Sequence, residues 1–528
     1  MDATGPLLAV AGAVVYFVTR QRDFWGDGYQ FCDFLQTRQL LHAHILYLPA
    51  AALLQWAASP FGVIDSEHAL LLLSALCGGA SLWLTYAFGK LVLGAKRPAL
   101  FAASLLGVLQ GFWFHSTVIE VHLVHTAGSW MLLAGLVLHA STDDRSKRTM
   151  VLVTLGQALS PATHLSGIAS AGVSWILGLT RRASRWLLPA STVGLAIFFT
   201  AYSIVRSVNW EFFKYYEGGF RNEYYPALLK DPARALQYLY IAGADLLSYT
   251  SPASAFLPVG LWLLAKRSRP LAATLALWFG AYLAICAPIG DPGMGGYYMA
   301  TAAPQVWLAT LALERLAALP ARALLAALAS MAPLAANAES AGARAAWSVA
   351  ALAAVTLVAW PLLRAREPVP PVRRVPIWLF SMTIATAACT FSGTVLPSLH
   401  NAQHEHMDRV IAATSRGGHV LIAESDFWLT AKIWRLRLSM AGRPPATYVW
   451  RFDIPAEAET GKAAAAARVD VDRWMAASET VWLVGGTEFG PEAKHSRAFL
   501  QWLDERYARE PSPEIDGLWR LRPKAPPR

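Results

Sequence analysis

The chain has 528 residues, of which 55% are hydrophobic and 15% are charged, and its formal net charge is +10. A soluble domain would carry about 25% charged residues, and several apolar runs here reach the ~20 residues that cross a bilayer. The composition therefore excludes an ordinary soluble protein and predicts a polytopic membrane protein. Lys and Arg form short clusters between the apolar runs instead of one basic stripe, which argues against nucleic-acid binding.

The apolar runs predict about thirteen transmembrane helices. The first, at residues 5–19, lacks the basic start and the small-residue cleavage site of a signal peptide, so we expect it to be retained. A broken apolar piece at residues 45–58 is too short for a span and predicts a helix lying in the membrane interface. The other spans are expected at residues 68–93, 99–114, 121–140, 150–160, 165–179, 186–208, 236–264, 271–287, 299–313, 321–334, 344–363 and 376–391.

The basic clusters predict the orientation of the chain in the membrane. They follow the second, fourth, sixth, eighth and twelfth predicted spans. Because Lys and Arg concentrate in cytoplasmic loops, the N-terminus should be cytoplasmic and the C-terminus extracytoplasmic. The richness in Ala, Arg and Gly is typical of a high-GC bacterium, so we expect the membrane to be the bacterial inner membrane.

The character of the sequence changes after about residue 392, where long apolar runs stop and charged residues become frequent. We therefore expect a transmembrane catalytic domain over residues 1–392 and an extracytoplasmic domain over residues 393–528. In the second part, strands are predicted at 419–423, 447–452 and 480–484, and helices at 427–438 and 496–507. Strands alternating with helices predict a small α/β domain with a parallel sheet.

Acidic, basic and aromatic side chains gather in the loops expected outside the cytoplasm. The first such loop contains Arg22–Asp33 and carries Asp27 between two glycines. A carboxylate at the mouth of a membrane bundle is costly unless it is solvated, paired or used, so Asp27 is either functional or part of a solvated loop. The other outer side chains singled out are Asp33, His42, His44, Glu120, His122, His125, His164, Arg206, Arg221, Asp291, Tyr297 and Tyr298. Together they fit a site for a polar substrate attached to a lipid.

Two segments resemble the GT-C superfamily of polytopic glycosyltransferases, most closely its protein O-mannosyltransferase-like group. Gly26–Phe31 followed by His42–Pro49 is similar to that group's Asp-Ser-Gly-Glu-Phe segment followed by His-Pro-Pro-Gly-Tyr-Pro. Phe112–His122 is similar to the group's Phe-Trp…Glu-Val-Tyr segment. The chain departs from the pattern at Gln30, where the group has an acid, and it lacks the Pro-Pro-Gly. The fold implied is a GT-C-like α-helical polytopic membrane protein with a small C-terminal α/β domain.

The resemblance also implies a reaction. Members of the superfamily take a sugar from a polyprenyl phosphate and transfer it with inversion on the extracytoplasmic side. In this chain Asp27 would be the general base that accepts the proton of the attacking hydroxyl. Arg206 and Arg221 would hold the departing phosphate, and Glu120 would orient the acceptor or a metal. The expected partners are a polyprenyl-phosphate sugar donor, a protein or glycan acceptor and membrane lipid, with no nucleic acid.

The outer histidines and tyrosines allow more than one interpretation. His42 and His44 could join Glu120, His122 and His125 in a divalent-metal site, since imidazole and carboxylate suit zinc or manganese. Their spacing matches no known metal motif, so hydrogen bonding in a polar vestibule is the favoured interpretation, and no cofactor is assigned. Tyr297 and Tyr298 fit either substrate binding or an interfacial aromatic belt. Asp291 fits a turn.

A membrane transporter or flippase with an appended outer domain is the main alternative function. Such proteins often contain internal repeats and charges near the middle of the membrane. Here the charges gather at one rim, and no internal repeat is evident. A family member that binds glycolipid without catalysis is a third alternative.

Overall fold

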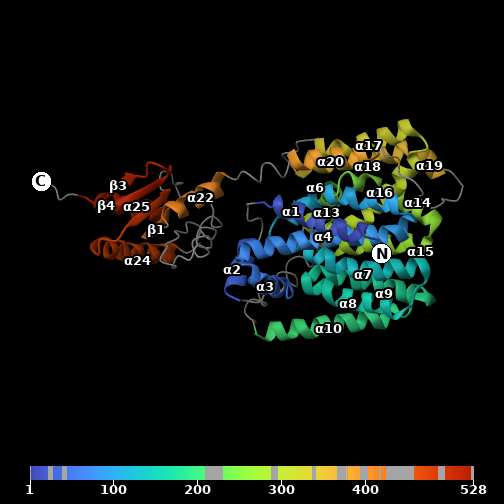
Figure 1. Cartoon of the computed structure of the whole chain (residues 1–528), viewed down its shortest axis with the longest axis horizontal. Helices are drawn as coiled ribbons and strands as arrows, with labels where there is room; N and C mark the ends of the chain where they lie inside the picture. The colour runs from blue at the N-terminus through green and yellow to red at the C-terminus, as the bar shows by residue number, and fades with distance from the viewer. Residues whose placement is uncertain are drawn as a thin grey trace. The chain divides into compact units, whose positions relative to one another are not determined.

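The computed structural model describes residues 2–21, 28–38, 44–62, 64–208, 230–286, 295–335, 341–364, 376, 379–392, 402–414, 418–423, 457–485 and 494–524. The chain divides into two compact units. One contains Met1–Gln21 and Phe34–Leu399, and the other contains Arg22–Asp33 and His400–Arg528. The larger unit is a helical bundle, and the smaller unit contains the sheet (Figure 1).

Most of the described residues before 400 are helical. In chain order the helices are α1 (Thr4–Val18), α2 (Gly28–Gln36), α3 (Tyr47–Ala58), η1 (Ser59–Phe61), α4 (Ser66–Leu93), α5 (Lys96–Val108), α6 (Gln110–Thr117), α7 (His122–Thr142), α8 (Lys147–Thr163), η2 (Leu165–Ile168), α9 (Ala169–Thr180), η3 (Arg182–Ser184), α10 (Leu187–Val208), α13 (Pro232–Tyr249), η5 (Ala253–Phe256), α14 (Leu257–Arg267), α15 (Arg269–Cys286), η7 (Gly295–Thr301), α16 (Ala302–Leu316), α17 (Pro320–Ala335), α18 (Ala341–Val358), α19 (Trp360–Arg364) and α20 (Phe380–Thr390).

The bundle is organised around α4, which packs against α1, α5 and α7. Figure 1 shows α7, α8, α9 and α10 side by side along one edge of the bundle, and α17, α18 and α20 along the other. The length of α4 follows from its ends. Asp65 caps its N-terminus by accepting the backbone N–H of His68 at 2.7 Å, and Gly94 ends it with a φ of 86°, a conformation that glycine adopts without strain.

Four helical stretches in the described residues are long and apolar enough to cross a membrane. They are Ser66–Leu93, His122–Thr142, Arg182–Val208 and Arg269–Cys286. A fifth is the pair α5 and α6, which meet at a bend of 62°. The count of about thirteen spans remains a prediction. The helix predicted in the interface is present as α3.

Two of the spans expected from the sequence are broken in the structure. The span expected at residues 236–264 is interrupted around Ser251-Pro252, since α13 ends at Tyr249 and α14 begins at Leu257. The span expected at residues 99–114 is present as α5 and α6 but bends between them, because Leu109 is extended (ψ 133°) and separates the two helices. Gly111, just past the bend, lies against the backbone of Tyr249, so close that a Cβ there would be 2.6 Å from the Tyr249 oxygen. A straight helix would not bring these two backbones together.

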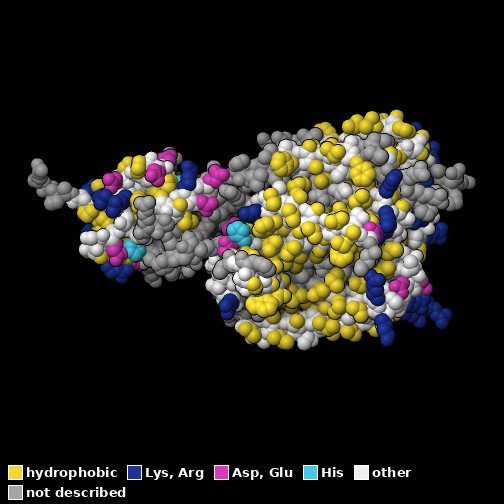
Figure 2. Space-filling view, viewed as in Figure 1, with side chains coloured by type: hydrophobic (Ala, Val, Ile, Leu, Met, Phe, Trp, Pro, Cys, Tyr) yellow, Lys and Arg dark blue, Asp and Glu magenta, His cyan; other side chains and the backbone are white. Residues whose placement is uncertain are grey.

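Basic side chains collect at one end of the bundle. Arg267, at the end of α14, donates from Nη1 to the carbonyls of Val92 and Leu93 at the end of α4. Lys266 Nζ donates to the carbonyl of Leu363 in α19 at 3.4 Å. Figure 2 shows apolar side chains over most of the visible face, with Lys and Arg gathered toward this end. The sequence predicted that these clusters share one face, and the side of the membrane on which they lie remains a prediction.

The smaller unit contains a four-stranded sheet in the order β1-β2-β4-β3. The strands are β1 (His419–Ala423), β2 (Val481–Gly485), β3 (Tyr507–Pro511) and β4 (Leu518–Pro523), and the helices are α22 (Ala402–Ala413), α24 (Glu457–Ala476) and α25 (Lys494–Arg506). Leu421, Leu483 and Leu521 of the sheet share one core with Trp474 of α24 and Leu503 of α25. The unit is thus a layered α/β structure.

The prediction of a wholly parallel sheet is wrong. Strands β1 and β2 pair in parallel as expected, but β4 pairs antiparallel with both β2 and β3. Strands β3 and β4 contain several arginines and charged partners, so they lack the continuous apolar run that identifies a buried strand. The strand predicted at 447–452 and the helix predicted at 427–438 lie outside the described residues.

Candidate functional site

Five histidines come together at the end of the bundle opposite the basic clusters. This histidine cluster consists of His44, His115, His122, His125 and His164. The first four are at most 9% exposed, and His164 is half-buried. His122 is the first residue of α7, whose other end leads to the basic segment after Thr142. The sequence predicted four of these five residues. The histidines meet because three segments converge: the α6–α7 connection, the α8–η2 connection and the segment before α3.

Glu120 and His122 flank the start of α7. Glu120 is 6% exposed, and its Oε2 accepts the backbone N–H of Val121 at 2.9 Å. The same oxygen lies 3.8 Å from Nε2 of His122, longer than a hydrogen bond but close enough for electrostatic interaction. The His122 ring meets the His115 ring edge to face at 4.9 Å. A buried carboxylate therefore lies among imidazoles.

The backbone fixes the tautomers of His44 and His164. Nδ1 of His44 lies 3.1 Å from the carbonyl oxygen of Thr163, so this nitrogen carries the proton and donates it. Nδ1 of His164 accepts the backbone N–H of Ser166 at 3.1 Å, so the proton of that ring is on Nε2. The two rings stack with centroids 4.9 Å apart. His44 therefore carries its ring proton on Nδ1, and His164 carries its ring proton on Nε2.

His125 connects the cluster to a buried polar network. Its Nδ1 donates to the carbonyl of Ser160 at 3.1 Å, and its Nε2 lies 3.2 Å from the hydroxyl of Tyr282. Tyr282 in turn donates to Ser129 at 2.9 Å. The His125 ring lies 5.5 Å from the ring of His164, measured between centroids. Such a network holds the ring in one orientation, because each polar atom would lose a partner if it turned.

The short helix η7 closes one side of the cluster. Tyr297 meets His122 at 5.1 Å and His164 at 5.0 Å, both edge to face. The indole nitrogens of Trp130 and Trp278 both donate to the carbonyl of Ala300, at 2.7 and 3.0 Å. These bonds tie η7 to α7 and α15, so Tyr297 is held against the histidines by the core of the bundle.

Burial sets the charge state of His164. The loss of water, together with the neighbouring rings of His44, His125 and His122, holds the pKa of His164 well below its ordinary value of 6.5. The ring is therefore neutral at neutral pH. A neutral imidazole of fixed tautomer can donate a hydrogen bond to a substrate oxygen, and it does so without adding positive charge to the site.

The structure brings some of the predicted site residues together and leaves others apart. Glu120, His44, His122, His125, His164 and Tyr297 are in contact with one another through the cluster. Tyr298 is 3% exposed and packs in the main core. Arg206 lies in the last turn of α10, next to Val205, which packs against the cluster of Ile45, Ala162 and Phe198. Asp33 is exposed on α2 in the other unit. Asp27, His42, Arg221 and Asp291 lie outside the described residues.

Sequence reasoning missed three buried polar residues near this site. His115 is fully buried on α6 and also stacks on Tyr249 at 6.3 Å. Asp245 is 6% exposed within α13. Tyr282 bonds the His125 network. An acid inside a predicted span is a functional candidate by default, so that signal could have identified Asp245.

The metal interpretation does not gain support from the described residues. Among them, no three side chains of His, Cys, Asp or Glu are grouped as metal ligands. Nδ1 of both His44 and His125 already donates to a backbone carbonyl.

We expect Gly296→Ala to destabilise the cluster. A Cβ at this position would lie 2.2 Å from Cδ2 of His122, so the ring would have to move. Overpacking of this kind costs about 1–3 kcal/mol, and the midpoint of thermal unfolding in detergent should fall accordingly. Gly280→Ala in α15 is the matched control, because nothing lies within 4 Å of its added Cβ. Equal midpoints for the two variants would mean that η7 does not hold His122.

No protein-family model and no curated protein matches the chain, but solved structures match it from end to end. The crystal structure of ArnT from Cupriavidus metallidurans bound to undecaprenyl phosphate matches 99% of this chain and 98% of its own, with a TM-score of 0.59 and 17% identity. The apo state of the same protein gives the same coverage and identity with a TM-score of 0.56. The match establishes the fold: the chain has the fold of ArnT, and the predicted helical membrane bundle with a small C-terminal α/β domain is confirmed.

Proposed function

We propose that this protein is an inverting glycosyltransferase that moves a sugar from a polyprenyl-phosphate donor to an acceptor hydroxyl on the extracytoplasmic face. The observation that carries the proposal is the end-to-end fold match to ArnT, a GT-C glycosyltransferase solved with undecaprenyl phosphate. The buried cluster of Glu120 and the histidines supports it, because it supplies polar groups at one end of an otherwise apolar bundle. The acceptor would be a protein or a glycan, as in the protein O-mannosyltransferase-like group, and the location the bacterial inner membrane.

The reaction is a single displacement. Asp27 takes the proton of the acceptor hydroxyl as its oxygen bonds to the anomeric carbon. The bond from that carbon to the phosphate oxygen breaks, and polyprenyl phosphate leaves with the electron pair. Arg206 and Arg221 neutralise the departing phosphate, since guanidinium matches phosphate oxygens with two parallel hydrogen bonds. The attack comes from the side opposite the leaving group, so the anomeric configuration inverts.

The histidine cluster orients the substrates in this scheme. Nε2–H of His164 donates to a sugar or phosphate oxygen, because Nδ1 of this ring is bonded to the backbone N–H of Ser166. His44 stacks on this ring and belongs to the same binding site. Holding both reactants in one geometry contributes to the rate even without proton transfer. Asp33, His42, His122, Tyr297 and Tyr298 are assigned to the same binding role.

A transfer assay with purified protein tests the proposal. The protein is incubated with a panel of polyprenyl-phosphate sugars and acceptors, and products are read by mass. We expect one donor to yield polyprenyl phosphate and an acceptor heavier by one sugar residue. The same donors in proteoliposomes test the alternative, because movement of lipid or solute across the membrane with no change of mass would identify a transporter or flippase.

Acidification should destabilise the protein through His164. Below pH 6.5 an ordinary histidine takes up a proton, while the folded protein keeps this ring neutral. The unfolded chain then binds more protons, so the free energy of unfolding falls as the pH drops below about 6.5. His164→Asn removes the titration and keeps a side-chain acceptor for Ser166 N–H. Its thermal midpoint should fall less than that of the wild type between pH ~7.5 and ~5. The same decline in both proteins would contradict a neutral buried His164.

A further inference from the structure

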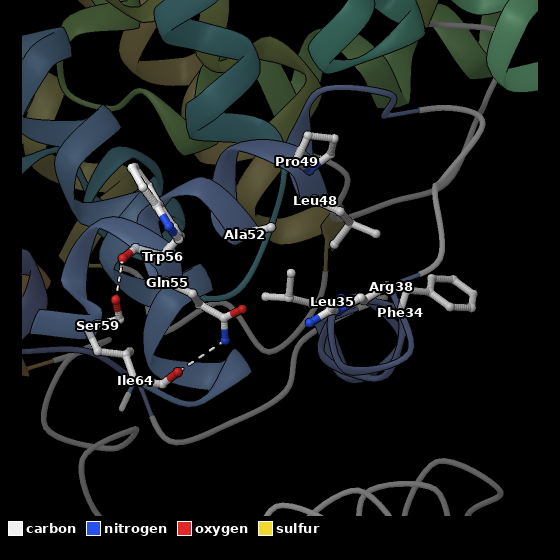
Figure 3. A pocket seen from close by; sticks show the side chains of 10 residues that line it. All are labelled: Phe34, Leu35, Arg38, Leu48, Pro49, Ala52, Gln55, Trp56, Ser59 and Ile64. Atoms are coloured by element: carbon white, nitrogen blue, oxygen red, sulfur yellow. Dashed lines mark hydrogen bonds between the residues drawn. The ribbon is translucent and has the colours of Figure 1, made fainter. Parts of the chain in front are cut away.

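A groove between the end of α2 and α3 lies apart from the histidine cluster. Its volume is about 740 Å³, within the range of pockets that hold one small ligand, about 300–1,000 Å³. Phe34 and Leu35 line it from α2, and Leu48, Pro49 and Ala52 line it from α3. Figure 3 shows Leu35 and Leu48 between the two helices. The groove therefore offers an apolar floor, and no residue of the histidine cluster lines it.

The groove lies where the bundle ends, on the side of the histidine cluster. The residues just before and at the start of α3 are anchored there, because Leu46 N–H donates to the carbonyl of Ala162 at the end of α8 and Ile45 packs against Phe198 of α10. Farther along α3, Leu53 is 62% exposed and Trp56, which lines the groove, is 74% exposed. Exposed tryptophan and leucine on a short helix at the end of a helical bundle are typical of contact with the membrane interface.

Among the described residues that line the groove, one is a cation. Arg38, two residues beyond the end of α2, lines the groove and is exposed. None of the ten residues that line the groove is acidic. A guanidinium beside this apolar groove matches one class of ligand, an acyl chain joined to a phosphate. None of the ten described residues that line the groove is assigned to sugar transfer, which favours a bound lipid over a reacting donor.

We propose that this groove binds one acyl chain of an anionic phospholipid, with Arg38 pairing with its phosphate. The proposal does not rest on the proposed glycosyltransferase activity. Burial of the chain against Leu35, Leu48 and Ala52 supplies the affinity, and Arg38 supplies the preference for an anionic headgroup. The lipid would fix the end of α2 against α3.

Photolabelling of the full-length protein tests the headgroup. Phosphatidylglycerol and phosphatidylcholine probes, each with a diazirine at the end of one acyl chain, are compared in vesicles, and labelled peptides are mapped by mass. We expect the peptides of α2 and α3 to be labelled about fivefold more by phosphatidylglycerol, since one Arg near the surface contributes about that factor. Arg38→Asn should remove the preference. Asparagine suits this position because Arg38 has a φ of 54°. Arg234→Asn, which removes an exposed cation from α13, should leave it unchanged.

A second pair of variants tests the apolar floor. Ala52→Phe fills the groove and should reduce labelling by both probes about tenfold, because it displaces a few methylene groups of the chain. Ala57→Phe, an exposed position on the same helix outside the groove, should not. Equal labelling by the two probes in the wild type, or equal labelling of the two phenylalanine variants, would overturn the proposal. Displacement of the phosphatidylglycerol probe by a small excess of polyprenyl phosphate would overturn it as well, by assigning the groove to the donor.

Discussion

Asp27→Asn is expected to lower the rate of sugar transfer by about 100- to 10,000-fold, the usual contribution of a positioned general base. The amide has nearly the same shape as the carboxylate, but it cannot take up the proton of the acceptor hydroxyl. Donor binding should persist, so the loss should appear in the turnover rate and not in the donor concentration at half-maximal rate. The measurement is the initial rate of transfer by the purified variant.

The matched control for this variant is Asp143→Asn. Asp143 is exposed, follows α7 at the basic end of the bundle and pairs with Arg145 at 2.9 Å. Its substitution should leave the rate unchanged. If Asp27→Asn is folded, inserted in the membrane and as active as the wild type, Asp27 is not the base.

Glu120→Gln should reduce transfer about 100-fold, the cost of a substrate held about 1 Å out of place. Glutamine keeps an oxygen that can accept the N–H of Val121, so the start of α7 should stay folded. The negative charge beside His122 is lost, and with it the interaction across 3.8 Å. The rate of transfer and the thermal midpoint are measured on the same preparation.

Glu120→Ala separates the charge from the hydrogen bond. Alanine loses both, so its thermal midpoint should fall below that of Glu120→Gln. If the glutamine variant keeps full activity and only the alanine variant is impaired, Glu120 is a structural residue of the α6–α7 connection.

Much of the fold can be predicted from the sequence because the membrane imposes a strong pattern. Long apolar runs give the helices, and Pro252 marks the break between α13 and α14. Strand β1 is predicted at its observed bounds because the apolar run that ends at Ala423 is short and has clear limits. Two glycines precede His419, and the acidic Glu424 follows Ala423. The bend between α5 and α6 could not be predicted. It depends on the contact of Gly111 with Tyr249, which is distant in sequence.

The candidate site shows the same division. The sequence identifies Glu120 and most of the histidines, because polar residues at the ends of apolar runs are conspicuous. It does not show that His44 and His164 stack, or that Thr163 and Ser166 fix their tautomers in opposite senses. The stacking and the bond from His44 to Thr163 arise from the meeting of segments more than a hundred residues apart, whereas the bond between Ser166 and His164 is local. Asp245 could have been identified from the sequence, because it is a lone acid in a predicted span, but it was overlooked.

The anomeric configuration of the product tests the central claim most directly. Once a donor is found, the sugar of defined configuration on the polyprenyl phosphate is compared by NMR with the sugar on the acceptor. One displacement assisted by a carboxylate base predicts that every product molecule has the opposite configuration. A product that keeps the donor's configuration would require two displacements through a covalent intermediate, and it would contradict the role given to Asp27.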